Sequence, residues 1–205
     1  MTTTFNPPPD FSISTERLHI SYLQPGNQTH SAFLHHVWNT EDFIQAEGDT
    51  GLNTPEKAGE FIASKVQSDY NRNKHGQMLV SLKPFPEASL AESKPIGIVS
   101  LMKGKPPNAY AAPDVGYTIL PEESGKGYAT EAAIGLINYA RRELNVNGVF
   151  GFCSRKDQRS RRVLEKIGLE FRGERHLKLF GGARSAVYAL PGMEQDLKVY
   201  GIDDE

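Results

Sequence analysis

The sequence contains little cysteine and no long apolar run. Cys153 is the single cysteine among 205 residues, so an intrachain disulfide is impossible and a reducing, cytoplasmic location is expected. No apolar run approaches the ~20 residues that cross a bilayer, and the opening MTTTFNPPPD lacks the apolar segment of a signal peptide. A formal net charge of −2 supplies no general attraction for nucleic acid or anionic lipid. We therefore expect neither a membrane nor a nucleic acid as a partner.

Two nucleotide-binding signatures are also missing, although the chain has a glycine-rich turn at residues 125–127. A P-loop needs a hydroxyl residue after its lysine and a glycine upstream, whereas Lys126 is followed by Gly127 and the upstream glycine is absent. A dinucleotide fingerprint needs a third glycine, whereas Ala129 and Thr130 follow the turn. Neither signature accounts for this turn.

Hydrophobic periodicity predicts one α/β domain with a mixed sheet, in the order β-α-α-β-β-β-α-β-α-β-β. The domain is expected to span 14–192, after an extended or disordered lead-in at 1–13 that contains three prolines and before a tail at 193–205. Strand 147–154 is a continuous apolar run, which is typical of burial on both faces. The predicted strands are 17–23, 77–83, 94–103, 114–120, 147–154, 173–180 and 183–190, and the predicted helices are 27–39, 54–71, 128–143 and 159–168.

The glycine turn precedes a helix, and this placement suggests a binding role. The first backbone N–H groups of a helix have no partner within it, and the helix dipole adds partial positive charge there. Small residues at 125, 127 and 129 would let phosphates approach the backbone closely. The alternative is an ordinary strand-to-helix turn.

The surroundings of the turn favour the binding role. The run Ser124–Ala129 (SGKGYA), preceded by DVGYTILPEE and followed by TEAAIGLINYARREL, resembles the acetyl-CoA motif of the Gcn5-related N-acetyltransferase (GNAT) superfamily. STERLHISYL and RKDQRSRRVLEKIGLEFRGE resemble further segments of the branch that includes the bacterial ribosomal-protein N-terminal acetyltransferases. The resemblance covers about residues 14 to 190. It implies a mostly antiparallel sheet flanked by helices, with acetyl-CoA bound between strands 114–120 and 147–154 and no metal.

The resemblance also implies which residues contact the cofactor. Ser124 stands where the family has Gln or Arg, so a longer side chain that braces the turn is missing. Asp157 stands where the branch often has Asn, and its alternative role is to cap the following helix. The implied cofactor residues are Ile119, Leu120, Ser124, Gly125, Lys126, Gly127, Tyr128, Ala129, Thr130 and Asp157.

Acetyl transfer requires a polarised thioester carbonyl and a proton for the departing thiolate. The resemblance assigns the first role to the strand backbone near Ile119 and Leu120, where the next strand is expected to splay away. Many relatives protonate the thiolate with a tyrosine, but Leu164 stands in that position here. Ser160 is therefore the predicted donor, with an ordinary helix hydroxyl as the alternative.

The general base is predicted among three acids. Asp114 lies on the strand that would meet the substrate, whereas Glu41 and Glu47 are expected in a loop after the first helix, and a solvated surface role is the alternative for each. The basic residues between 155 and 166 fit either a solvated helix face or contacts to the 3′-phosphate of CoA. His35 and His36 are adjacent on one helix and cannot ligate one metal together.

These observations predict an acetyl-CoA-dependent N-acetyltransferase, monomeric or homodimeric, whose acceptor is a primary amine on a protein N-terminus or a small molecule. The alternative is a non-catalytic CoA-binding or interaction module with the same fold. The departures at Ser124, Asp157 and Leu164 motivate that alternative.

Overall fold

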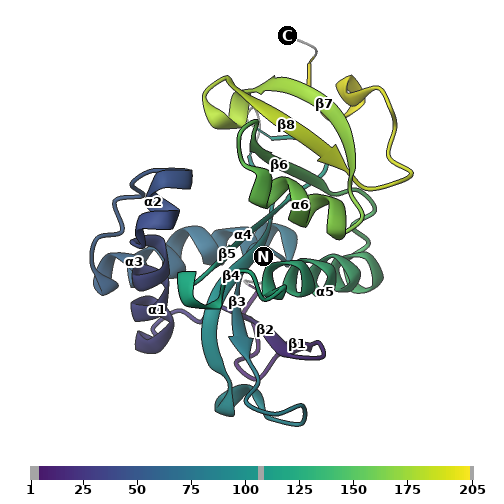
Figure 1. Ribbon diagram of the computed structural model, residues 1–205. Coiled ribbons are helices and arrows are strands. Elements are labelled where there is room, and N and C mark those ends of the chain that lie inside the picture. The colour runs from purple at the N-terminus through teal and green to yellow at the C-terminus, as the bar shows by residue number, and fades with distance from the viewer. Residues whose placement is uncertain (1–4, 106–108, 204–205) are drawn as a thin grey trace.

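The computed structural model describes residues 5–105 and 109–203, and these residues form an eight-stranded sheet with helices on both faces (Figure 1). The strand order is β1-β2-β3-β4-β5-β6-β8-β7, and β5 and β6 are the one parallel pair within this part of the chain. The predicted mixed, mostly antiparallel sheet is therefore confirmed. Residues 1–4 of the expected lead-in, 106–108 and 204–205 of the expected tail lie outside the described residues.

The predicted elements all form, with small shifts at their ends. The strands are β1 (Ser12–Ser14), β2 (Leu18–Tyr22), β3 (Gln77–Leu82), β4 (Lys94–Met102), β5 (Asp114–Ile119), β6 (Phe150–Ser154), β7 (Glu170–Leu177) and β8 (Ala183–Ala189). The helices are α1 (Gln28–Trp38), α2 (Glu41–Glu47), α3 (Pro55–Phe61), a π-helical turn (Ile62–Val66), α4 (Gln67–Asn73), α5 (Tyr128–Glu143) and α6 (Gln158–Lys166). Short 3₁₀ turns are Leu90–Glu92, Pro121–Glu123, Lys178–Phe180 and Leu197–Tyr200.

One strand and one α-helix were not predicted. β1 has only 3 residues and forms by pairing with β2, so its sequence carries too short a pattern to detect. α2 occupies the region expected to be a loop, because the Thr40 hydroxyl caps it by accepting from the Phe43 N–H. The expected loop positions of Glu41 and Glu47 are thus wrong, since they are the first and last residues of α2.

The described parts of the lead-in and of the tail pack on the domain. The Phe5 and Phe11 rings lie 5.6 Å and 4.9 Å from the ring of Tyr22. Near the other end, the side chains of Leu197 and Ile202 are buried. The packed fold therefore reaches beyond 14–192 on both sides.

The helices divide between the two faces of the sheet. α5 crosses one face, where Gly135 lets it approach Thr15 and Ile20 closely, since a Cβ at Gly135 would lie 2.8 Å from Thr15 Cγ2. α4 passes on the other face, and α1, α2 and α3 gather beside it (Figure 1). α1 and α3 pack against each other. This arrangement leaves the C-terminal end of β5 and the start of α5 accessible beside a cavity.

The sheet divides between β5 and β6. These strands pair only at Asp114–Phe150 and Val115–Gly151, after which β5 continues beside β4 and β6 beside β8. We call the unpaired region beyond Val115 the strand split. It begins about four residues before the expected position near Ile119. The split also explains why β6 is not buried on both faces as predicted: Ser154 at its end is exposed.

Candidate active site

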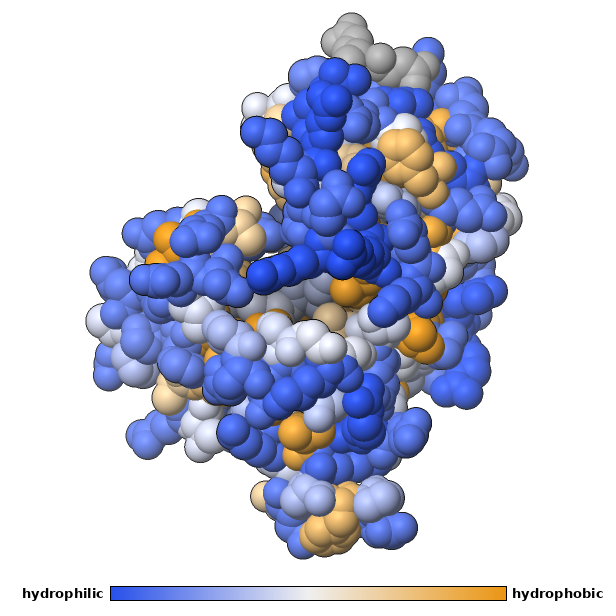
Figure 2. Space-filling view, in the orientation of Figure 1, coloured by the Kyte–Doolittle hydropathy of each residue, from blue (hydrophilic) through white to orange (hydrophobic). Residues whose placement is uncertain are grey.

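A cavity of about 550 Å³ lies between the C-terminal end of β5, the glycine turn and α6. Figure 2 shows the molecule hollowed there, below a ridge of hydrophilic residues. Of the predicted cofactor residues, Leu120, Lys126 and Asp157 do not line this cavity. Those that do are Ile119, Ser124, Gly125, Gly127, Tyr128, Ala129 and Thr130. The predicted catalytic Ser160 also lines it, whereas Asp114 does not.

The glycine turn holds two residues in the left-handed backbone region. Gly125 has a φ of 79° and Gly127, the N-cap of α5, has a φ of 87°. No side chain in the described part of the chain caps α5. Among the described residues, no acceptor is found for the backbone N–H groups of 125–130. A row of free donors therefore lies at the positive end of a helix beside the cavity, as an anionic ligand requires.

The strand split exposes further backbone donors on β5. The Leu120 N–H donates to the Ile96 carbonyl at 2.9 Å, so Leu120 faces β4 and cannot offer its N–H to a ligand. Because alternate residues of a strand face the same neighbour, the N–H groups of Tyr117 and Ile119 point into the split. Of the two backbone groups predicted to polarise the thioester, the Ile119 N–H is thus free to bind a ligand. The Leu120 N–H is already bonded to Ile96.

The polar side chains of the turn bond to neighbouring groups of the protein. The Ser124 hydroxyl donates to the Leu120 carbonyl at 3.2 Å, which ties the turn back to the strand end. The Lys126 ammonium lies 2.7 Å from the Glu123 carboxylate and is half exposed. The Arg17 guanidinium, which the sequence reasoning did not single out, donates to the Lys126 carbonyl at 3.0 Å. No local signal identifies Arg17, because it lies 109 residues away in the chain.

α6 begins with a capped turn that contains both Asp157 and Ser160. One Asp157 carboxylate oxygen accepts from the backbone N–H groups of Arg159 and Ser160, each at 3.0 Å, so the capping role is confirmed. The other oxygen accepts from the Ser160 hydroxyl at 2.6 Å. The Ser160 carbonyl in turn accepts from the Tyr117 hydroxyl at 3.0 Å, and Tyr117 also lines the cavity. The bond from Tyr117 connects α6 to β5 across the strand split.

An acidic group lies where the split begins. Burial raises the pKa of Asp114 to about 7, the backbone hydrogen bond of Asp114 opposes the rise, and the Glu47 carboxylate adds to it. Glu47 is an exposed residue, but burial of its carboxyl raises the pKa of that group. The Asp157 carboxylate raises the Glu47 pKa further. The fold thus gathers carboxyls from α2, β5 and the cap of α6, whereas Glu41 stays exposed.

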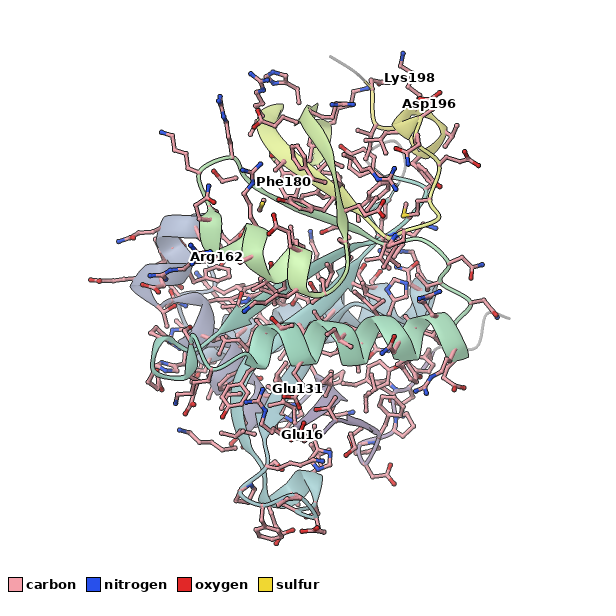
Figure 3. All side chains as sticks on the ribbon, turned by 45° about the vertical axis from the view of Figure 1, so that its right-hand side comes forward. Glu16, Glu131, Arg162, Phe180, Asp196 and Lys198 are labelled. Carbon is pink, nitrogen blue, oxygen red and sulfur yellow. The ribbon has the colours of Figure 1, made fainter. Side chains whose placement is uncertain are left out.

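Cationic side chains of α6 line the wall of the cavity that faces the glycine turn. They are Arg159, Arg162 and Lys166, and Arg162 is labelled on α6 in Figure 3. Arg159 lies 3.5 Å from Asp42 of α2, an exposed pair across the cavity mouth. Cys153 is unsuited to nucleophilic attack, because burial raises the pKa of its thiol to about 11. Within 5–105 and 109–203, no His, Cys, Asp or Glu cluster could hold a metal, and no helix could cross a bilayer.

Comparison with known families shows which family the chain belongs to. Residues 21–170 match the model of the acetyltransferase (GNAT) domain family. The chain belongs to the GNAT acetyltransferase family. The predicted family resemblance is therefore confirmed.

Individual relatives agree with this assignment. YnaD of Bacillus subtilis, an N-acetyltransferase by name, is 28% identical over 115 residues, which span 56% of this chain and 64% of YnaD. The matched region is thus less than two thirds of that relative. The ribosomal-protein-S5-alanine acetyltransferase of Vibrio fischeri shares the fold with a TM-score of 0.68 and 19% identity, covering 92% of this chain and 99% of its own. The microcin C7 self-immunity acetyltransferase MccE, solved with acetyl-CoA and AMP, shares the fold with a TM-score of 0.67 and 18% identity. That match covers 85% of this chain and 92% of MccE.

Proposed function

We propose that this GNAT protein transfers the acetyl group of acetyl-CoA to a primary amine by direct attack on the thioester. The observation that carries the proposal is the row of free N–H groups at 125–130, which opens into the cavity beside the strand split. The family membership supports it, and the fold relative MccE was solved with acetyl-CoA. The acceptor is either a protein α-amine or a small molecule.

The pyrophosphate of acetyl-CoA is proposed to bind at the glycine turn. Backbone N–H groups and the α5 dipole neutralise its charge there, so no metal ion is needed. From that turn the pantetheine arm would follow β5 into the split. The 3′-phosphate would lie near Arg159, Arg162 or Lys166, the cations on the facing wall. Lys126, paired with Glu123, and Asp157, which caps α6, are weaker candidates for direct contact than the sequence implied.

The chemistry is proposed to occur in the strand split. The amine nitrogen attacks the thioester carbon while the free N–H groups of Tyr117 and Ile119 stabilise the developing oxyanion. Asp114, with a pKa near 7, accepts the amine proton. The carbon–sulfur bond then breaks, and the thiolate takes a proton from the Ser160 hydroxyl, whose oxygen regains one from solvent while Asp114 releases its proton to solvent. Ser160 can do this only by turning its hydroxyl away from Asp157, to which it now donates.

A thiol-release assay tests the proposal. Acetyl-CoA is incubated with a panel of peptides with free N-termini, polyamines, aminoglycosides and amino acids, and CoA release is followed. At least one amine should accelerate thiol release over acetyl-CoA alone. Ser160→Ala should keep the affinity for CoA and lower kcat, since it removes a group that acts on the leaving thiolate.

The non-catalytic alternative makes the opposite prediction. Leu164 favours this alternative, because it stands where many relatives have the tyrosine that protonates the thiolate. Its side chain is buried in the core and does not line the cavity. CoA binding without turnover across the whole panel would favour that alternative, and the absence of CoA binding would contradict both. The cytoplasmic location, the oligomeric state and the lack of nucleic-acid binding stay predictions.

A further inference from the structure

We infer that Arg17 positions the glycine turn for the pyrophosphate, acting from the turn between β1 and β2. The inference rests on the proposed function and adds a residue that the binding motif itself does not contain. Its basis is a set of contacts that the Arg17 guanidinium makes on both sides of Gly127. Ser124, by contrast, has too short a side chain to span the turn and bonds back to the strand end.

The Arg17 guanidinium contacts three consecutive parts of the turn and helix. Its Nη1 donates to the Lys126 carbonyl at 3.0 Å, and its Nε donates to Glu131 Oε2 at 2.7 Å. Its Cζ lies 4.6 Å from the centre of the Tyr128 ring, a cation–π contact. One planar guanidinium therefore joins the peptide before Gly127, the side chain after it and the first turn of α5.

The bond to the Lys126 carbonyl determines where the next N–H points. In a trans peptide the C=O and the following N–H point in opposite directions. Because the Lys126 carbonyl points toward Arg17, the Gly127 N–H points away from Arg17. Gly127 also lines the cavity. Arg17 thus holds the Gly127 donor in the direction that a phosphate would need.

Such a brace is needed because the backbone around Gly127 has few other restraints. Glycine has more backbone freedom than any other residue, and two glycines flank Lys126. Neither a side-chain cap nor a backbone acceptor among the described residues holds the N–H groups of 125–130. A turn fixed before binding spares the ligand the entropy of ordering it.

Arg17 also compensates a negative charge close to the proposed phosphate site. Glu131 lies in the first turn of α5, on the side toward Glu16 and the β1–β2 turn (Figure 3). Its carboxylate accepts from the Thr15 hydroxyl at 2.6 Å and from the Arg17 N–H at 2.8 Å, besides the Arg17 side chain. Burial alone would raise the pKa of Glu131, but these bonds outweigh it and keep the pKa low. The carboxylate is therefore ionised, and the Arg17 charge offsets it.

A positioning role must be separated from a simple tether between the N-terminal strands and α5. Thr15→Val provides the matched control, since Thr15 bonds to the same Glu131 carboxylate but contacts neither Lys126 nor Tyr128. Arg17→Met removes the guanidinium while keeping an unbranched apolar stem. Arg17→Lys keeps the charge, but an ammonium cannot span Glu131 and the Lys126 carbonyl as a planar fork does.

The experiment measures CoA affinity by calorimetry and turnover with acetyl-CoA and with acetyl-pantetheine, which has no pyrophosphate. Arg17→Met should weaken CoA binding about tenfold, as expected for one lost charge-assisted brace. Its KM for acetyl-CoA should rise by a similar factor while kcat changes less than about twofold. The ratio of kcat/KM for acetyl-CoA to that for acetyl-pantetheine should fall about tenfold. Arg17→Lys should be intermediate, and Thr15→Val should bind CoA as the wild type does.

Three results would overturn the inference. They are CoA binding by Arg17→Met within about twofold of wild type, an equal loss in Thr15→Val, and an equal loss with acetyl-pantetheine. If Arg17→Met does not fold, wild-type affinity in Arg17→Lys overturns it as well. A wild-type protein that binds no CoA would instead refute the proposed function, and this inference with it.

Discussion

Gly127 is the residue on which the proposed phosphate site depends most directly. With a φ of 87° it adopts a conformation that side chains rarely tolerate, and it lines the cavity. Gly127→Trp should abolish CoA binding, because a Cβ there would lie 3.4 Å from Arg17 Nη2, and the indole would displace the guanidinium that holds the turn. Calorimetry with CoA is the measurement. Some loss of stability, about 1–2 kcal/mol from backbone strain, is also expected.

Lys126→Ala is the matched control for Gly127→Trp. Its ammonium is half exposed and paired with Glu123, so its charge is screened from the cavity. CoA affinity should change by less than about threefold. If Gly127→Trp, shown to be folded by circular dichroism, still binds CoA with wild-type affinity, the pyrophosphate does not lie on this turn.

Asp114 leads to a prediction about pH. A base must be ionised to accept a proton, so kcat/KM should rise with pH and level off above a pKa of about 7. Because the Glu47 charge raises that pKa, Glu47→Gln should move the rise to lower pH. Asp114→Asn should lower turnover at every pH while CoA affinity stays near wild type. A rate profile that is flat between about pH 5 and 9 in the wild type would exclude Asp114 as the base.

Stability gives an independent check on the same carboxyl. Its folded pKa is raised above the ordinary value of 3.8, so folding disfavours the ionised form. The free energy of unfolding should thus fall as pH rises from about 4 toward 7, through this group. Asp114→Asn cannot ionise, and it should gain thermal stability relative to the wild type at about pH 8 but not at about pH 4.

At the scale of single elements, two features fix α6: a cap at its first turn and close packing against β6. Asp157 caps its first turn, and Leu164 fills the space that Gly151 leaves on β6. A Cβ on Gly151 would lie 2.3 Å from Leu164 Cδ2, so only glycine permits this close approach. This packing explains why Leu164 contributes to the core instead of the cavity.

The cap of α6 gives a prediction for the element. Asp157→Ala should lower the free energy of unfolding by about 1 kcal/mol, the usual effect of losing an N-cap. Asp157→Asn should retain most of it, because an amide oxygen also accepts from the first N–H groups. Chemical denaturation measures both. The predicted contact between Asp157 and the cofactor would gain support if Asp157→Asn changed CoA affinity more than it changed stability.

At the scale of the whole molecule, cofactor binding should be visible as stabilisation. A ligand that binds only the folded state at about 100 times its Kd stabilises that state by about 2.7 kcal/mol. For a chain of this size, acetyl-CoA should then raise Tm by roughly 5–10 °C. Differential scanning calorimetry with and without acetyl-CoA measures the shift. Free adenosine at the same concentration is the control, and an equal shift with it would argue against binding through the phosphates.

Local patterns in the sequence were enough to predict the main elements and the glycine turn. Strands such as 77–82 and helices such as 128–143 carry strong periodicity, and that signal depends only on neighbouring residues. The turn could be predicted for the same reason, because Gly125 and Gly127 lie directly before the apolar pattern of a helix. Most of the predicted cofactor residues consequently do line one cavity.

Which of those groups are free to act depends on the tertiary structure. The sequence cannot show that the Leu120 N–H is bonded to Ile96, or that β5 and β6 separate directly after Val115. Nor can it show Arg17 bonded to the Lys126 carbonyl across 109 residues, or Glu47 close enough to shift the pKa of Asp114. Register, strand separation and side-chain pairing between distant segments arise from packing, and no local pattern encodes their geometry.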